Sequence, residues 1–218
     1  MELIPEVQVG EVSGALAEKA SLIAAAAVLT TAADDGNIPE PITLAEAKAH
    51  LRVYGDDEDA YITGLIVAAR EMAEGRLNRT IRQRTRTALF RGWSDDFQLT
   101  KPPFISIDTI TYADEEGQVQ TLDNALYYVA SQEDDAPGVV EFVPGYALPV
   151  LYTRRRPVTV SYLAGYPEGG VPRAIVQWML LAIGALYQNR ESVVAGVSVA
   201  ALPDDFMQLL IQPYMVYE

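Results

Sequence analysis

The spacing of hydrophobic residues changes twice along this chain and divides it into helical and extended parts. From residue 57 to 78, apolar side chains recur every three or four residues, the period of a helix that buries one face. From about 82 to 168, short runs of β-branched and aromatic residues alternate with polar turns, which is typical of antiparallel strands. Helical spacing returns from 172 to 189. This order predicts an α+β fold, in which a small helical bundle carries an inserted antiparallel β region.

Local signals predict where the other helices begin. Thr43, followed three residues later by Glu46, forms a capping box that satisfies free backbone N–H groups, so we expect a helix over 44–54. The acidic run 56–59 lies where the next helix starts, and acids are favoured there because the helix N-terminus is positive. A short helix is expected over 203–212, between two prolines.

Residues 1–41 are expected to be an N-terminal extension, and residues 42–218 the main domain. An Ala-rich run, 20–33, resembles the apolar part of a signal peptide, but four glutamates and one lysine precede it, where a signal peptide is positive. We therefore expect an ordinary helix at about 14–31. No uncharged run reaches the roughly 20 residues that a bilayer requires, so no membrane contact is expected.

Composition excludes several classes of function. The 218 residues carry a net charge of −14, which repels nucleic acid phosphates rather than binding them. The chain has no cysteine, so disulfides, thiolate metal sites and cysteine nucleophiles are excluded. Half of the residues are hydrophobic, enough for a sizeable core.

The single histidine, His50, lies close to the acidic run Asp56–Asp59, which raises the question of a metal site. Such a site needs at least three converging ligands, and the run lacks the alternation and central glycine of a calcium loop. We interpret His50 and the acids as structural, and we expect neither a metal nor a cofactor.

No enzyme class is favoured. Ser198, in "GVSVA", lacks the strand and directly following helix of a nucleophile elbow. A carboxylate-dependent hydrolase remains the alternative, because paired acids occur at four turns. These pairs are Asp95–Asp96, Glu115–Glu116, Asp134–Asp135 and Asp204–Asp205.

Six of the 16 basic residues lie between residues 76 and 91. On a strand, Arg82, Arg84 and Arg86 would point the same way and would suit an acidic partner, such as another copy of the chain. Intrachain ion pairing is the alternative interpretation. The helix that contains Trp178 is apolar almost all round, so it lies at the centre of the domain or packs on another subunit.

The order of these elements resembles the head–tail connector (adaptor) proteins of long-tailed bacteriophages, prophages and gene transfer agents. The resemblance covers about residues 42–213, and it is carried by the segments "ITLAEAKAHLRV", "DDEDAYITGLIVAAREMAEGRLNRTI", "ISIDTITYADEEGQVQTLD", "RPVTVSYLAGYP", "VPRAIVQWMLLAIGALYQNRESV" and "LPDDFMQLLIQPY". The extension 1–41 departs from the family pattern.

The resemblance implies a structural virion protein, not an enzyme. Such adaptors assemble, typically as twelve copies, into a ring at the head–tail junction. The ring joins the portal protein to the stopper or tail-completion protein, and DNA passes through its channel without sequence-specific binding. Assembly would occur in the cytoplasm of the bacterial host.

The C-terminal segment is dense in large apolar residues and is expected to bind a partner. In the resembling adaptors this segment reaches the portal, which makes the portal the expected partner. The expected contacts are Phe206, Leu209, Leu210, Tyr214, Met215 and Tyr217. The alternatives are that the segment folds back on its own domain, or that the chain is a monomeric protein-binding module.

Overall fold

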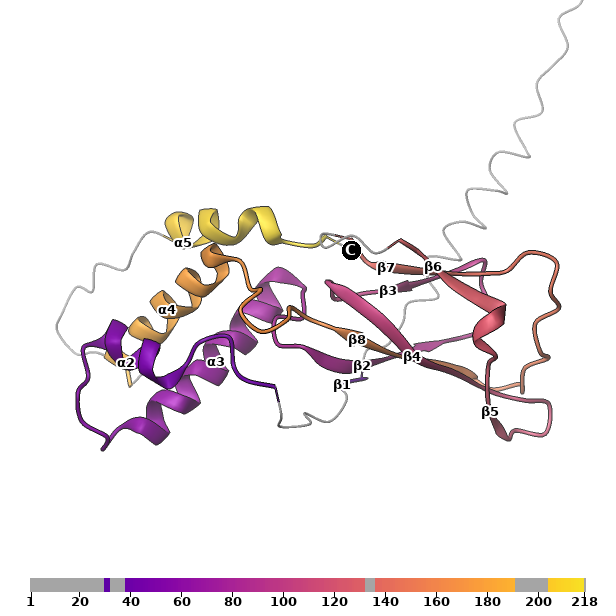
Figure 1. The fold of residues 1–218 in the computed structure, drawn as a ribbon, viewed down its shortest axis with the longest axis horizontal. Coiled ribbons are helices and arrows are strands. Elements are labelled where there is room, and N and C mark those ends of the chain that lie inside the picture. The colour runs from indigo at the N-terminus through magenta and orange to yellow at the C-terminus, as the bar shows by residue number, and fades with distance from the viewer. Residues whose placement is uncertain (1–29, 32–37, 132–135, 191–203, 218) are drawn as a thin grey trace, which may run out of the picture.

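The structure of the protein is a computed structural model that describes residues 30–31, 38–131, 136–190 and 204–217. The helices gather at one end of the molecule and two β-sheets lie at the other, so the expected α+β class is confirmed (Figure 1). The α-helices of the described part are α2 (Leu44–Leu51), α3 (Asp59–Leu77), α4 (Arg173–Gln188) and α5 (Asp204–Ile211).

The strands form a five-stranded sheet of order β1-β2-β8-β4-β5 and a three-stranded sheet of order β3-β7-β6. All neighbouring strands pair antiparallel. Their bounds are β1 (Thr30–Thr31), β2 (Arg84–Phe90), β3 (Asp96–Leu99), β4 (Phe104–Ala113), β5 (Val119–Thr121), β6 (Tyr127–Ser131), β7 (Gly138–Phe142) and β8 (Val158–Ala164).

The two sheets enclose their own hydrophobic core. Along β8 every second residue is buried, as expected for a strand with one face against a core. Phe90 on β2 stacks on Phe97 on β3 with ring centroids 4.1 Å apart, which joins the sheets. Gly138 allows β7 to approach, because a Cβ there would lie 2.6 Å from Cγ of Phe104.

A second core lies among the four helices. Ile62, Leu77, Ile175 and Met179 are fully buried in it, and α5 contributes Ile211, which is 1% exposed. The predicted capping box is present, since Thr43 Oγ1 accepts from Glu46 N and the Glu46 side chain accepts from Thr43 N. Helix α5 therefore covers part of this core.

The structure corrects three expected boundaries. The helix expected over 44–54 ends at Leu51, because Arg52 adopts a left-handed conformation (φ 60°) and its N–H bonds back to Ala49 O. The helix expected over 57–78 begins two residues later, at Asp59, so only the last residue of the acidic run is helical. The helix expected at about 14–31 lies almost wholly outside the described residues, and its last two residues form β1, paired with β2.

The β region is inserted between α3 and α4, and backbone hydrogen bonds fix it at both crossings. Thr80 N donates to Pro102 O at 3.0 Å, and Tyr166 N donates to Ile81 O at 3.1 Å. The outgoing and returning chains therefore lie side by side where the sheets meet the helices.

Candidate assembly surfaces

The arginines predicted at a subunit interface lie at this junction, close to a buried carboxylate. The Glu74 side chain is 9% exposed and accepts hydrogen bonds from Arg84 Nη2 at 2.7 Å and Arg70 Nη1 at 3.3 Å. It also accepts from the backbone N–H of Ile81 at 2.8 Å. Two cations and a backbone donor thus compensate the cost of burying the charge.

The other side chains predicted at a subunit interface are also bonded or buried within the protomer. Arg82 Nε donates to Ile38 O at 2.7 Å, and Arg82 Nη1 lies 3.5 Å from a carboxylate oxygen of Glu40. Arg86 is 6% exposed, and burial lowers the pKa of its guanidinium from the ordinary value. Trp178 is buried among the helices. Their assignment to a subunit interface stays a prediction.

Sequence reasoning missed Glu74 and Glu40, the carboxylates that bind these arginines. A signal for Glu74 was available, because it falls on the same helical face as the apolar residues Ile66, Ala73 and Leu77 and lies four residues after Arg70. An acid on a buried helical face predicts a buried cation beside it. Glu40 is 30 residues from Arg70, and no local pattern marks it.

The acidic run makes cross-element ion pairs rather than capping α3, whose N-cap residue Glu58 has no capping side-chain bond. Lys48 Nζ lies 2.8 Å from Asp56 and 2.6 Å from Asp59, which joins α2 to α3. Glu58 accepts from Tyr187 and Arg190 at the end of α4. The two cationic partners and the tyrosine hydroxyl therefore give the run a structural role in the helical layer.

His50 lies next to α4. Its Nε2 is 3.6 Å from the position that a Cβ on Gly184 would occupy. Among the described residues, no three histidine or acidic side chains converge as a metal site would require.

The C-terminal segment folds back on its own domain and also exposes apolar groups. Val216 N donates to Leu77 O at 3.0 Å, and the buried Arg79 donates to Tyr214 O. Leu210, Tyr214 and Met215 pack against the helical core. Two of the six expected portal contacts remain open to solvent: Leu209, 65% exposed, and Tyr217, 78% exposed. The side chain of Phe206 lies outside the described residues.

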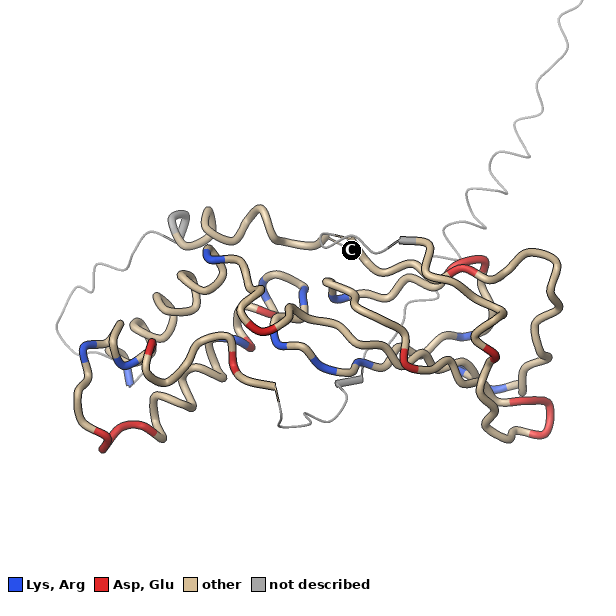
Figure 2. The backbone as a smooth tube through the Cα atoms, viewed as in Figure 1, with Lys and Arg blue, Asp and Glu red and all other residues tan. Residues whose placement is uncertain are grey.

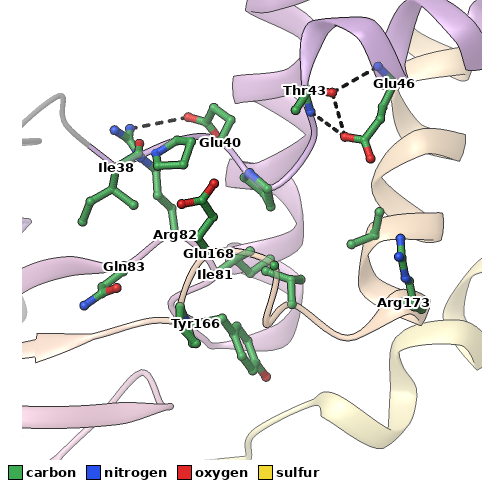
Figure 3. A pocket seen from close by; sticks show the side chains of 16 residues that line it. Ile38, Glu40, Thr43, Glu46, Ile81, Arg82, Gln83, Tyr166, Glu168 and Arg173 are labelled. Carbon is green, nitrogen blue, oxygen red and sulfur yellow. Dashed lines mark hydrogen bonds and ion pairs between the residues drawn. The ribbon is translucent and has the colours of Figure 1, made fainter.

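A cavity of about 270 Å³ lies beside the junction (Figure 3). Its lining has no histidine, serine, cysteine or lysine, and two of its carboxylates are already bonded. Glu40 pairs with Arg82, and Glu46 accepts from Thr43. The two hydroxyl groups of the lining are also bonded, because Thr43 Oγ1 donates to Glu46 and Tyr166 Oη accepts from Arg79.

Three described carboxyl groups have a pKa shifted in the direction opposite to that of a general acid. A general acid needs a raised pKa. Hydrogen bonds lower the carboxyl pKa of Glu46 (from Thr43), Asp56 (from Lys48) and Asp114 (from Gln120). Ser198 and the Asp134–Asp135 pair lie outside the described residues. No helix in the described part is long and apolar enough to cross a membrane.

Comparison with known proteins identifies similar folds and a family. Residues 41–133 match the family model described as phage gp6-like head–tail connector protein. The chain is similar to a protein in the neck of an empty GTA particle computed with C6 symmetry (TM-score 0.69, 20% identity). It is also similar to one in the virion of a native gene transfer agent (GTA) particle (TM-score 0.69, 22% identity).

A third similar chain belongs to the neck of a native GTA particle computed with C12 symmetry (TM-score 0.65, 21% identity). Each of these likenesses covers 88% of this chain and 96% of the other chain. Comparison with curated proteins gives no match.

The described fold has two hydrophobic cores, with buried ion pairs at the junction between them. The match of residues 41–133 to the family model confirms the expected resemblance to head–tail connector proteins. The matched residues include α2, α3 and the strands β2 to β6.

Replacing Glu74 with glutamine should lower the free energy of unfolding by about 3 kcal/mol, because it leaves Arg70 and Arg84 without the buried charge that compensates them. Urea unfolding followed by circular dichroism measures this. The matched control is Glu71→Gln, whose side chain is 66% exposed and should change stability by at most about 0.5 kcal/mol. Equal effects of the two substitutions would contradict the junction assignment.

The Glu58 contacts should add stability that is lost in acid. Its hydrogen bonds from Arg190 and Tyr187 lower the carboxyl pKa below the ordinary value of 4.5. A group with a lowered folded-state pKa stabilises the fold above its unfolded pKa, and this stability is lost as the pH falls through the folded value. The melting temperature of Glu58→Gln should therefore be below wild type at pH 7, and the difference should disappear as the pH falls below 4.5 and through the folded-state pKa.

Calorimetry across this pH range measures the difference. Because these contacts are at the surface, the difference should be small even at pH 7. His50→Gln is the control and should leave the acid dependence unchanged. A rise of several degrees when a divalent cation is added would instead indicate a metal site.

Proposed function

We propose that this protein forms a ring at the head–tail junction of a phage or gene transfer agent particle. The ring joins the portal to the stopper or tail-completion protein, and DNA passes through its channel. The observation that carries the proposal is the family match to head–tail connectors, together with the fold likeness over 88% of the chain to proteins of a particle neck. The C6 and C12 symmetries of those necks support a cyclic assembly, twelve copies being the expected number.

The charge of the chain supports passage of DNA rather than its binding. A net charge of −14 repels a phosphate backbone, and the arginines Arg70, Arg82 and Arg84 are paired with carboxylates inside the protomer. These three arginines are therefore not available to hold DNA.

The exposed part of the C-terminal segment supports a contact with the portal. Leu209 and Tyr217 lie on a segment whose inner side is already packed on the helical core, so their exposure is not a consequence of a loose chain end. Exposed aromatic and aliphatic side chains on an ordered element are typical of protein interfaces.

Ring formation is tested by electron microscopy of particles and of the purified protein mixed with the portal protein of the same particle. We expect a cyclic ring of this chain next to the portal at the head–tail junction. Isolated monomers at that position, or a location elsewhere in the particle, would contradict the proposal.

The portal contact is tested by replacing Leu209 and Tyr217 together with serine. Portal affinity should fall at least about tenfold, since each exposed anchor is worth about 1 kcal/mol or more. The melting temperature should not change. The control is Tyr54→Ser, a tyrosine 93% exposed in the loop between α2 and α3, which should leave affinity unchanged.

Point substitutions are preferable here to a chain that ends at Gln212. That truncation would also remove Tyr214 O, the acceptor for the buried Arg79, and would destabilise the fold. Unchanged affinity of the double serine variant would show that the portal binds elsewhere.

A further inference from the structure

The end of the β-sandwich away from the helices carries a surface that the connector role does not yet explain. It consists of the β4–β5 hairpin, residues 114–119, and the loop between β7 and β8, residues 143–156; we call these two segments the distal patch (Figure 1). They adjoin, because Tyr152 N donates to Ala113 O at 3.0 Å. The Tyr152 ring also lies 3.5 Å from where a Cβ on Gly117 would be.

The distal patch exposes large apolar side chains. Val119 is 67% exposed, Tyr146 and Val150 are each 64% exposed, and Tyr152 is 44% exposed. Single exposed apolar residues are common, but four on two adjoining segments are typical of a surface that binds another protein.

The same two segments expose charges of both signs. Glu115 and Glu116 lie at the hairpin tip, and Arg154 and Arg155 lie on the loop (Figure 2). None of the four has an ion-pair partner within 4.0 Å among the described residues. At the junction, by contrast, Arg70, Arg82 and Arg84 are paired with carboxylates.

The acidic side of the patch belongs to a long segment without cations. The 52 residues from 102 to 153 contain no lysine or arginine and nine acids. Arg154–Arg156 then follow directly. No lysine or arginine therefore lies near the hairpin in the sequence. The cations of the patch come from a different segment, the loop between β7 and β8.

We propose that the distal patch is the contact between neighbouring copies in the ring, with the acidic hairpin of one copy against the arginine loop of the next. A second copy offers both signs of charge, whereas a partner of one sign would match only half of the patch. A ring contact is heterologous, since two different surfaces of the same chain meet, so the proposal requires the hairpin to face one neighbour and the loop to face the other. This inference rests on the proposed ring.

Charge reversal tests the contact, because two variants that each fail alone should assemble together. Glu115→Arg with Glu116→Arg makes both segments basic, and Arg154→Glu with Arg155→Glu makes both acidic. Either variant alone places like charges together at every contact, so the ring fraction on the portal protein should fall at least about tenfold. A mixture of the two alternates around an even-numbered ring with opposite charges at every contact, and rings should return.

Negative-stain microscopy and mass photometry measure the ring fraction, and both variants should melt like the wild type because the four side chains have no partners inside the described protomer. Asp57→Arg with Asp95→Arg makes the same change in net charge as the hairpin variant, at exposed acids elsewhere, and it should not reduce the ring fraction.

If wild type forms no ring with the portal, the proposed function fails. If wild type forms rings and both variants do as well, or the mixture is not rescued, the distal patch is not the subunit contact. If the mixture of variants formed closed dimers instead of rings, the heterologous arrangement would also be wrong.

Discussion

The relative position of the two halves of this protein depends on the buried carboxylate of Glu74. Its donors come from both sides of the junction: Arg70 from α3, Ile81 N from the first residues after the helix, and Arg84 from β2. If the sheets moved away from the helices, a charge would be left buried without partners, at a cost of several kcal/mol. Glu40 extends the contact, because it binds both Arg70 and Arg82 and so holds the segment before α2 against the same cluster.

Because of this arrangement, most arginines of the basic stretch between residues 76 and 91 do not form an open positive surface. Read along the sequence, it is a dense positive patch in an acidic chain. In the fold, Arg79 and Arg86 are buried, and Arg82 and Arg84 lie against carboxylates. Charge at the junction therefore stabilises the protomer, whereas Arg154 and Arg155 at the distal patch are exposed.

The sequence predicts the helices well because each carries a strong local signal. Apolar spacing marks α3 and α4, and a capping box marks the start of α2. The split of the strands into two sheets was not predictable, since strand periodicity gives the buried face but not the neighbour. The partners of the arginines were missed for the same reason: Glu40 meets Arg82 across 42 residues. The C-terminal segment was predicted to bind a partner. In the structure some of its apolar side chains pack on the helical core and others are exposed, and this division depends on the shape of that core.

The energetics of the distal patch bear on where assembly would occur. A surface ion pair is worth roughly 0.2–1 kcal/mol, because water screens the charges and two long side chains must be ordered. Two or three such pairs with a few apolar side chains cannot hold free copies together against the loss of translational and rotational freedom. Copies already bound to a portal are held at a high effective concentration, so the same weak contact becomes sufficient to close a ring. An exposed, weakly cohesive patch of this kind would therefore keep the protein monomeric until its binding partner is present.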